Sequence, residues 1–178
     1  MILVPLMLLA SIALSALNPG VMMPPVKGET LSGHDAVLPD VAAGKIALIA
    51  MGFSYDSRFS VEAWTGRFRK EYGKNAAVTF YEVPMIDGVA RLGKWFIQSG
   101  MRRGTARDDR ENVVTVFGDG EAWKRRLSFT SADGAYLILI DRSGVVRWRY
   151  NGAMDESAYG ELTRQMQELL SGSGKERR

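Results

Sequence analysis

Unbroken apolar runs and apolar residues at helical spacing alternate along most of the chain. Residues 46–51 form the clearest run, with six apolar residues and no polar alternation, which is typical of a strand covered on both faces. Residues 57–72 place Phe59, Trp64 and Phe68 at helical spacing, with charged side chains on the other face. The pattern predicts a strand followed directly by an amphipathic helix.

The same signals continue to the end of the chain. They predict a hairpin at residues 28–39, strands at 77–83, 113–117, 135–140 and 145–150, and helices at 91–101, 121–127 and 155–170. Strand–helix–strand units imply parallel pairing with right-handed crossovers, and a turn at 141–144 adds an antiparallel pair. We therefore expect an α/β fold, a three-layer sandwich whose central mixed sheet has helices on both faces.

Three residues in or directly before these helices carry more specific predictions. Trp64 and Trp95 lie within predicted helices, and we expect both in the core. Asp155 precedes the last helix and is expected to be its N-cap.

The two ends of the chain differ from its body. Residues 1–17 carry no charged side chain but are shorter than the ~20 residues of a membrane span. They predict a signal peptide cleaved after Ser15, with a short hydrophobic anchor or a buried helix as alternatives. Three prolines predict a linker at 18–27, followed by one domain at 28–170 and a disordered basic tail at 171–178. We therefore expect an exported or membrane-associated protein, periplasmic or extracytoplasmic.

Composition removes several function classes. The 178 residues suffice for one domain, and the absence of cysteine removes disulfides, thiolate metal sites and cysteine nucleophiles. We expect no bound metal and no cofactor. Two of the three net positive charges come from residues 175–178, so the body is nearly neutral and nucleic acid is not an expected partner. Ser32, His34 and Asp35 are adjacent in a turn, which suits a surface turn better than a catalytic triad.

The residues after the first apolar strand resemble the redox loop of thioredoxin-like proteins. Ser54-Tyr55-Asp56-Ser57 has the CxxC spacing with serine in both positions, and it opens the following helix. The resemblance implies a thioredoxin-like fold, with Ser54, Tyr55, Asp56, Ser57 and Arg58 as a candidate loop at the degenerate redox position. The family's proline before the fourth long strand is missing from residues 131–135. Without a thiolate we expect neither thiol–disulfide exchange nor thiol peroxidase activity. Asp56 is expected to cap the helix, with Ser57 as the alternative.

A closer resemblance covers roughly residues 45–170. It is carried by the strand–loop–helix with Trp64 and Phe68, by the strand at 78–84, and by residues 141–148, which read D-R-S-G-V-V-R-W. These segments are similar to the thioredoxin-like assembly-factor family for the membrane sector of mitochondrial ATP synthase, and the apparent export signal suits a bacterial envelope relative. The resemblance implies a redox-inactive binding or assembly module with a protein partner, and not an enzyme.

An enzyme of the hydrolase type on the same scaffold is the alternative, using Ser, Asp or Tyr in place of a thiol. A cleft that holds a strongly perturbed carboxylate with a second polar group at ~3 Å would favour it.

Local charge supplies a second candidate site. Residues 91–110 hold six basic side chains against Asp108 and Asp109, and residues 102–112 are predicted to be a loop. We expect Arg102, Arg103, Arg107 and Arg110 to contact an acidic partner surface or an anionic headgroup. A merely solvated loop is the alternative.

Overall fold

The computed structural model describes residues 16–172. The predicted signal peptide, its cleavage after Ser15 and residues 173–178 of the predicted tail lie outside this range. The first two residues of that tail do not: α4 (Glu156–Gly172) continues through them.

The fold is a seven-stranded mixed sheet in the order β2-β1-β5-β4-β3-β6-β7. Its strands are β1 (Val26–Thr30), β2 (Asp35–Leu38), β3 (Ile46–Gly52), β4 (Val78–Ile86), β5 (Val114–Phe117), β6 (Ala135–Ile140) and β7 (Val146–Gly152). β4 pairs in parallel with β3 and with β5, and the other pairs are antiparallel. The predicted hairpin, the parallel crossovers and the late antiparallel pair are all confirmed.

The central strand β3 divides the core in two. All seven of its residues are buried, as the unbroken apolar run predicted. Ala47, Ile49 and Met51 point to one face of the sheet, and Leu48 and Ala50 point to the other. Each face therefore needs its own cover.

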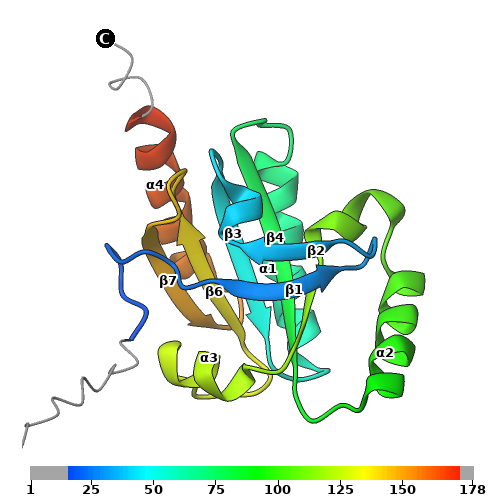
Figure 1. Ribbon diagram of the computed structural model, residues 1–178. Coiled ribbons are helices and arrows are strands. Elements are labelled where there is room, and N and C mark those ends of the chain that lie inside the picture. The colour runs from blue at the N-terminus through cyan, green and yellow to red at the C-terminus, as the bar shows by residue number, and fades with distance from the viewer. Residues whose placement is uncertain (1–15, 173–178) are drawn as a thin grey trace, which may run out of the picture.

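The two faces are covered differently (Figure 1). One carries the helices α1 (Ser57–Tyr72) and α4, and the other carries α3 (Gly120–Arg126) together with the β1–β2 hairpin. A hairpin thus completes the layer for which helices were expected. The helix α2 (Arg91–Gly104) stands at the side of the sheet, and the short 3-10 turns η1 (Asp40–Ala42) and η2 (Arg107–Asn112) link neighbouring elements.

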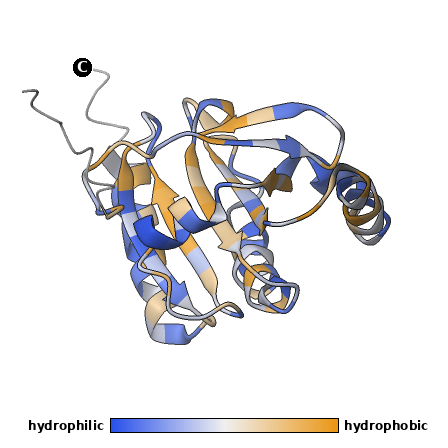
Figure 2. Cartoon of the chain, turned by 60° about the horizontal axis from the view of Figure 1, so that its bottom comes forward, coloured by the Kyte–Doolittle hydropathy of each residue, from blue (hydrophilic) through white to orange (hydrophobic). Residues whose placement is uncertain are grey.

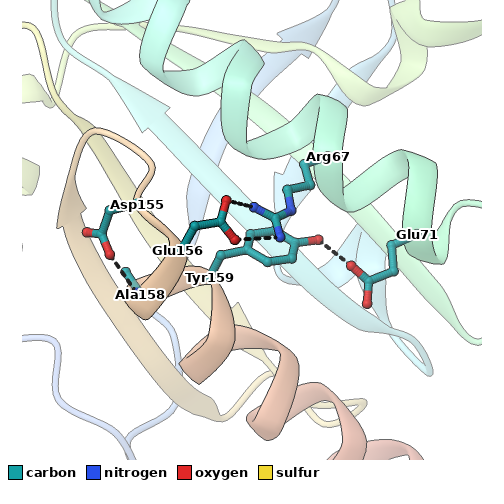
Figure 3. A network of polar contacts seen from close by, with 6 residues as sticks. All are labelled: Arg67, Glu71, Asp155, Glu156, Ala158 and Tyr159. Atoms are coloured by element: carbon teal, nitrogen blue, oxygen red, sulfur yellow. Dashed lines mark hydrogen bonds and ion pairs between the residues drawn. The ribbon is translucent and has the colours of Figure 1, made fainter.

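A polar network joins α1 to α4 over the aromatic core (Figure 3). The Arg67 guanidinium donates to both Glu156 carboxylate oxygens at 2.6 and 3.0 Å and stacks on the Tyr159 ring, while the Tyr159 hydroxyl donates to Glu71 at 2.8 Å. Burial and the Glu71 carboxylate raise the pKa of Tyr159. Asp155 accepts from the Ala158 N–H at 2.8 Å, which confirms it as the cap of α4.

Residues 18–27 are not a linker. Leu17 and Met23 are buried in the core, and the Leu17 N–H and Met23 N–H donate to the carbonyls of Arg126 and Gly144 at 3.0 and 2.9 Å. The Arg149 guanidinium donates to the Leu17 carbonyl at 2.8 Å. The prolines and glycine do not prevent packing, so the segment from Leu17 onward is part of the folded body.

The β6–β7 hairpin explains the D-R-S-G-V-V-R-W string. The Asp141 carboxylate accepts from the Ser143 and Val145 N–H groups and from the Arg147 guanidinium. Burial alone would raise the pKa of Asp141, but the bonds from Ser143 and Arg147 outweigh it and hold that pKa below its usual range. Asp141 therefore fixes the turn, which lets Trp148 enter the core on the next strand.

Candidate functional site

The loop at the degenerate redox position begins where β3 leaves the core. Gly52 ends the strand, and a β-carbon at this position would collide with the Ser57 hydroxyl oxygen. Ser57 starts α1 and is itself buried, at 1% exposure. The glycine therefore lets α1 start directly against the end of the strand.

Ser54 and Ser57 bond to each other rather than to solvent. The Ser57 N–H donates to Ser54 Oγ at 3.0 Å, and Ser57 Oγ donates back to the Ser54 carbonyl at 2.7 Å. Ser54 thus supplies the side-chain cap of α1. The predicted cap at Asp56 is wrong, because Asp56 already has helical backbone angles and its side chain makes no capping bond.

A second loop, residues 128–134, faces Ser54. The Tyr136 hydroxyl accepts from the Thr130 and Ser131 N–H groups at 2.8 and 2.9 Å and donates to the Ser131 carbonyl at 2.9 Å. The loop places Asp133 so that its carboxylate accepts from Ser54 Oγ at 2.9 Å. The hydroxyl protons of both loop serines are therefore used within the protein.

The outward side of the redox-position loop is aromatic and cationic. The Arg58 guanidinium carbon lies 3.9 Å from the centre of the Tyr55 ring and 4.4 Å from that of Phe59. Tyr55 is 73% exposed and Phe59 is 59% exposed. Phe59 was expected on the buried face of α1, which is instead formed by Val61, Trp64 and Phe68. We call Tyr55, Arg58 and Phe59 the aromatic–arginine stack. It can offer a partner both π-faces and a positive charge.

The four candidate arginines separate into two kinds. Arg102 Nε donates to the Leu31 carbonyl at 2.6 Å, and Arg110 Nη2 donates to the Arg102 carbonyl at 2.6 Å, so both half-buried side chains hold backbone together. Arg103 and Arg107 are exposed. Residues 102–112 are also not a loop, since they form the last turn of α2, a short link and η2. Arg103 and Arg107 remain available to meet an anion.

A cleft of about 400 Å³ between α1, β4 and the end of α2 was not anticipated. It is lined in part by Thr65, Arg69, Glu82 and Asp109, and Arg69 pairs with Asp109 at its rim. Thr65 Oγ1 lies 2.6 Å from Glu82 Oε1 and 3.0 Å from the Val61 carbonyl oxygen. A charged residue amid the apolar positions of β4 was the sequence signal that could have revealed this cleft.

Glu82 is the titratable group in that cleft. Burial raises the pKa of Glu82, and the Glu62 and Asp109 carboxylates add to the effect, whereas Thr65 and Arg69 oppose it. One hydroxyl proton cannot serve two acceptors, and protonation of Glu82 resolves this, because its carboxyl then donates to Thr65 while Thr65 donates to Val61. The cleft therefore brings a carboxyl group with a raised pKa within 2.6 Å of the Thr65 hydroxyl.

His34 lies in the β1–β2 turn, where its Nδ1 is 2.8 Å from Glu111 Oε1 and its side chain is 71% exposed. This bears out the surface turn and gives no nucleophile–base–acid arrangement.

Across residues 16–172, no three His, Asp or Glu side chains are grouped to hold a metal ion. In the same range, no helix combines the length and apolar character of a membrane span.

The fold defines a class of protein: a thioredoxin-like domain, here without any cysteine. The chain resembles a Chlorobium tepidum protein described as the thiol:disulfide interchange protein DsbE (17% identity, TM-score 0.59, 87% of this chain and 99% of that one). It also resembles the exposed lipoprotein thioredoxin of Streptococcus pneumoniae (15%, 0.55, 80% and 99%) and the thioredoxin domain of a thiol-disulfide oxidoreductase from Bacteroides vulgatus (19%, 0.53, 84% and 98%).

A sequence profile narrows this class to one family. The profile of the ATP10 protein family matches residues 9–169, and the chain belongs to that family. No curated protein matches the chain's sequence. The predicted fold and the predicted family are both confirmed, and the absence of cysteine separates this chain from the thiol chemistry that its structural neighbours are named for.

Proposed function

We propose that this protein is a redox-inactive assembly module of the cell envelope, which binds a protein partner during assembly of a membrane complex. One observation carries the proposal. The position that holds reactive thiols in thioredoxins is here internally bonded through Ser54 and Ser57, while the adjacent surface presents the aromatic–arginine stack. The site therefore offers a surface for recognition but has no thiol that could react.

The location rests on separate support. Residues 1–15 read as an export signal, and Leu17, the first buried residue of the described range 16–172, lies two positions after Ser15, where the cut is proposed. Cleavage there would leave the packed segment intact. The pneumococcal neighbour, an exposed lipoprotein, is an example of this fold outside the cytoplasm.

The basic residues have a supporting part in this proposal. Arg103, at the end of α2, and Arg107, on η2, are exposed, and they would meet acidic groups of a partner or anionic headgroups. Arg102 and Arg110 act by fixing this part of the backbone.

The proposal is tested by complementation. A strain that lacks the protein is supplied with the native chain or with variants, and the assembled complexes of its energy-transducing membrane are separated on native gels. Tyr55→Ala/Phe59→Ala should reduce assembly of one complex, and a photo-crosslinker at Tyr55 should capture a subunit of that same complex. Ser54→Ala/Ser57→Ala should retain substantially more assembly, because no thiol-type chemistry depends on these hydroxyls. Arg164→Ala, which changes an exposed side chain on α4, is the matched surface control.

Normal assembly with the Tyr55/Phe59 variant, at native protein level, would contradict the proposal. Loss of assembly in the serine variant, with the fold intact, would place the function in the hydroxyls instead.

A hydrolase is the second candidate function, favoured by the Glu82 cleft. Glu82 would exchange a proton with a substrate bound beside Arg69. Glu82→Gln keeps the shape of the side chain and removes the proton exchange, so a catalytic role requires that this variant lose in vivo activity while it still binds the partner. Full activity of Glu82→Gln would exclude this role.

A further inference from the structure

The outward face of α2 carries a compact group of large apolar side chains. Leu92 is 80% exposed, Phe96 is 67% exposed and Trp95 is 64% exposed. Their spacing puts them on one side of the helix within its first two turns, and the Trp95 and Phe96 rings meet edge to face with centroids 4.9 Å apart. We call Leu92, Trp95 and Phe96 the α2 apolar face.

This face does nothing for the fold. The printed side-chain bonds of α2 to the body come from other residues, through Gln98 Nε2 donating to Thr115 Oγ1 at 2.9 Å and Arg102 Nε donating to the Leu31 carbonyl at 2.6 Å. None of the helix's described side chains is buried. Figure 2 shows α2 standing apart from the sheet with apolar residues on it. Exposed apolar groups of this size, gathered on a projecting element, mark a binding surface.

The charge of α2 indicates what kind of surface binds to the α2 apolar face. Its sequence holds Arg91, Lys94, Arg102 and Arg103 and contains no acidic residue. Arg103 is exposed and lies on the same side of the helix as Leu92 and Phe96, about three turns after Leu92 and about two turns after Phe96. The combination of Trp, Phe and Leu with Lys and Arg is the composition of helices that lie in the headgroup region of a bilayer.

Shape points the same way. The apolar face lies on a helix at the side of the molecule, and Leu92, Trp95 and Phe96 line neither the cleft beside Glu82 nor the pocket between Ile86 and Phe117 within residues 16–172. A projecting helix face suits a soft, planar surface. A protein partner would have to supply a matching groove.

We propose that α2 is a peripheral membrane contact, which inserts Leu92, Trp95 and Phe96 at the boundary of headgroups and acyl chains of an anionic bilayer. Arg103 extends from the same side of the helix to the lipid phosphates. The inference goes beyond partner binding and uses none of Tyr55, Arg58 and Phe59, so the two proposals can fail independently.

Trp95 provides a reporter specific to this helix. The other three tryptophans, Trp64, Trp123 and Trp148, are at most 7% exposed, whereas Trp95 faces solvent. The full chain is mixed with vesicles made of equal parts of phosphatidylcholine and phosphatidylglycerol. We expect a blue shift of tryptophan emission and quenching by brominated acyl chains, and both should disappear in Trp95→Phe. Attachment of the vesicle through any other segment leaves this signal unchanged.

Matched variants then test the residues. Leu92→Ser/Phe96→Ser should weaken the quenching-derived affinity by roughly tenfold or more, whereas Tyr55→Ser/Phe59→Ser, an equally exposed aromatic pair, should not change it. Arg103→Gln should weaken it by roughly fivefold at low salt, and Lys70→Gln, an exposed α1 control, should not. Circular dichroism checks that every variant is folded.

Two results would overturn the proposal. One is an unshifted Trp95 signal on vesicles that the protein demonstrably binds. The other is an unshifted Trp95 on vesicles together with shielding of Trp95 by a purified partner protein, which would make α2 a protein-docking helix. Equal quenching by pure phosphatidylcholine vesicles would overturn the anionic specificity.

Discussion

The helices α1 and α2 begin in similar places and have opposite fates. Each follows a parallel strand, and each carries a tryptophan among other apolar residues. Trp64 of α1 is fully buried, with its ring centroid 5.4 Å from that of Tyr150 and 5.9 Å from that of Tyr159. Trp95 of α2 lies in solvent. The difference teaches that an apolar helix face is buried only where a face of the sheet is still uncovered. On the face that α1 packs against, α1 and α4 already cover the sheet.

The sharpest test of this comparison exchanges each tryptophan for alanine. Trp64→Ala should lower the free energy of unfolding by about 3–5 kcal/mol, because it leaves a cavity between two helices and the sheet. Trp95→Ala should change it by less than about 0.5 kcal/mol. Urea unfolding followed by circular dichroism measures both. Similar losses in the two variants would mean that α2 packs against the body in solution.

The two neighbouring arginines at the end of α2 give the next largest difference. Arg102→Gln should destabilise the protein by about 1–2 kcal/mol, because the Leu31 carbonyl loses a charged donor. Arg103→Gln should have an effect below about 0.5 kcal/mol, since its side chain is exposed. The same unfolding assay applies. If Arg103→Gln proves the more harmful, the separation of structural from available arginines is wrong.

The start of α1 can be tested at its cap. Ser54→Ala removes the oxygen that accepts the Ser57 N–H and should cost about 1 kcal/mol. Asp56→Ala should cost only a few tenths of that amount, because Asp56 makes no capping bond. Unfolding free energies of both variants are compared with the native chain, and a larger loss for Asp56→Ala would restore the cap predicted from the sequence.

The smallest expected effect is a pH dependence of the unfolding free energy, which arises from Glu82 in the cleft between α1, β4 and the end of α2. The raised pKa of Glu82 means that the folded state binds its proton more tightly than the unfolded state. The stabilisation is therefore complete below the ordinary pKa of glutamate and is lost as pH rises through the folded-state value. The native chain should lose stability relative to Glu82→Gln over this window, measured by unfolding at successive pH values.

The charges of Glu62, Asp109 and Arg69 also act on the Glu82 carboxyl group. Glu62→Gln, which removes one of these neighbouring charges and leaves Glu82 in place, is therefore the control. A difference between the native chain and Glu82→Gln that does not vary with pH would contradict the assignment.

Local patterns predicted what depends on local structure. The apolar run of β3 and the Asp155 cap were correct because each depends on a few neighbouring residues. The loop at residues 54–58 could be placed between β3 and α1, because its position after β3 follows from the order of strand and helix. The aromatic–arginine stack was indicated only in part, since Tyr55 and Arg58 were candidates and Phe59 was assigned to the core.

The errors share one cause, which is competition among distant segments for the same surface. A helical period shows that α2 has an apolar side but cannot show that the sheet is already covered. Arg102 and Arg103 look alike in a charge count, and only the position of Leu31 separates them. Residues 18–27 have the composition of a linker, yet Met23 is buried and its N–H donates to the Gly144 carbonyl, which is distant in the sequence.

The burial of Leu17 has a consequence for the timing of maturation. Only Ala16 separates the core from the peptide bond proposed for cleavage, and one residue spans roughly 3.5 Å. A protease needs an extended substrate in its cleft, so the folded body leaves it almost no slack at that bond. If the chain is cut after Ser15 as proposed, the protease therefore acts before Leu17 packs into the core, and only Ala16 then precedes the packed residue.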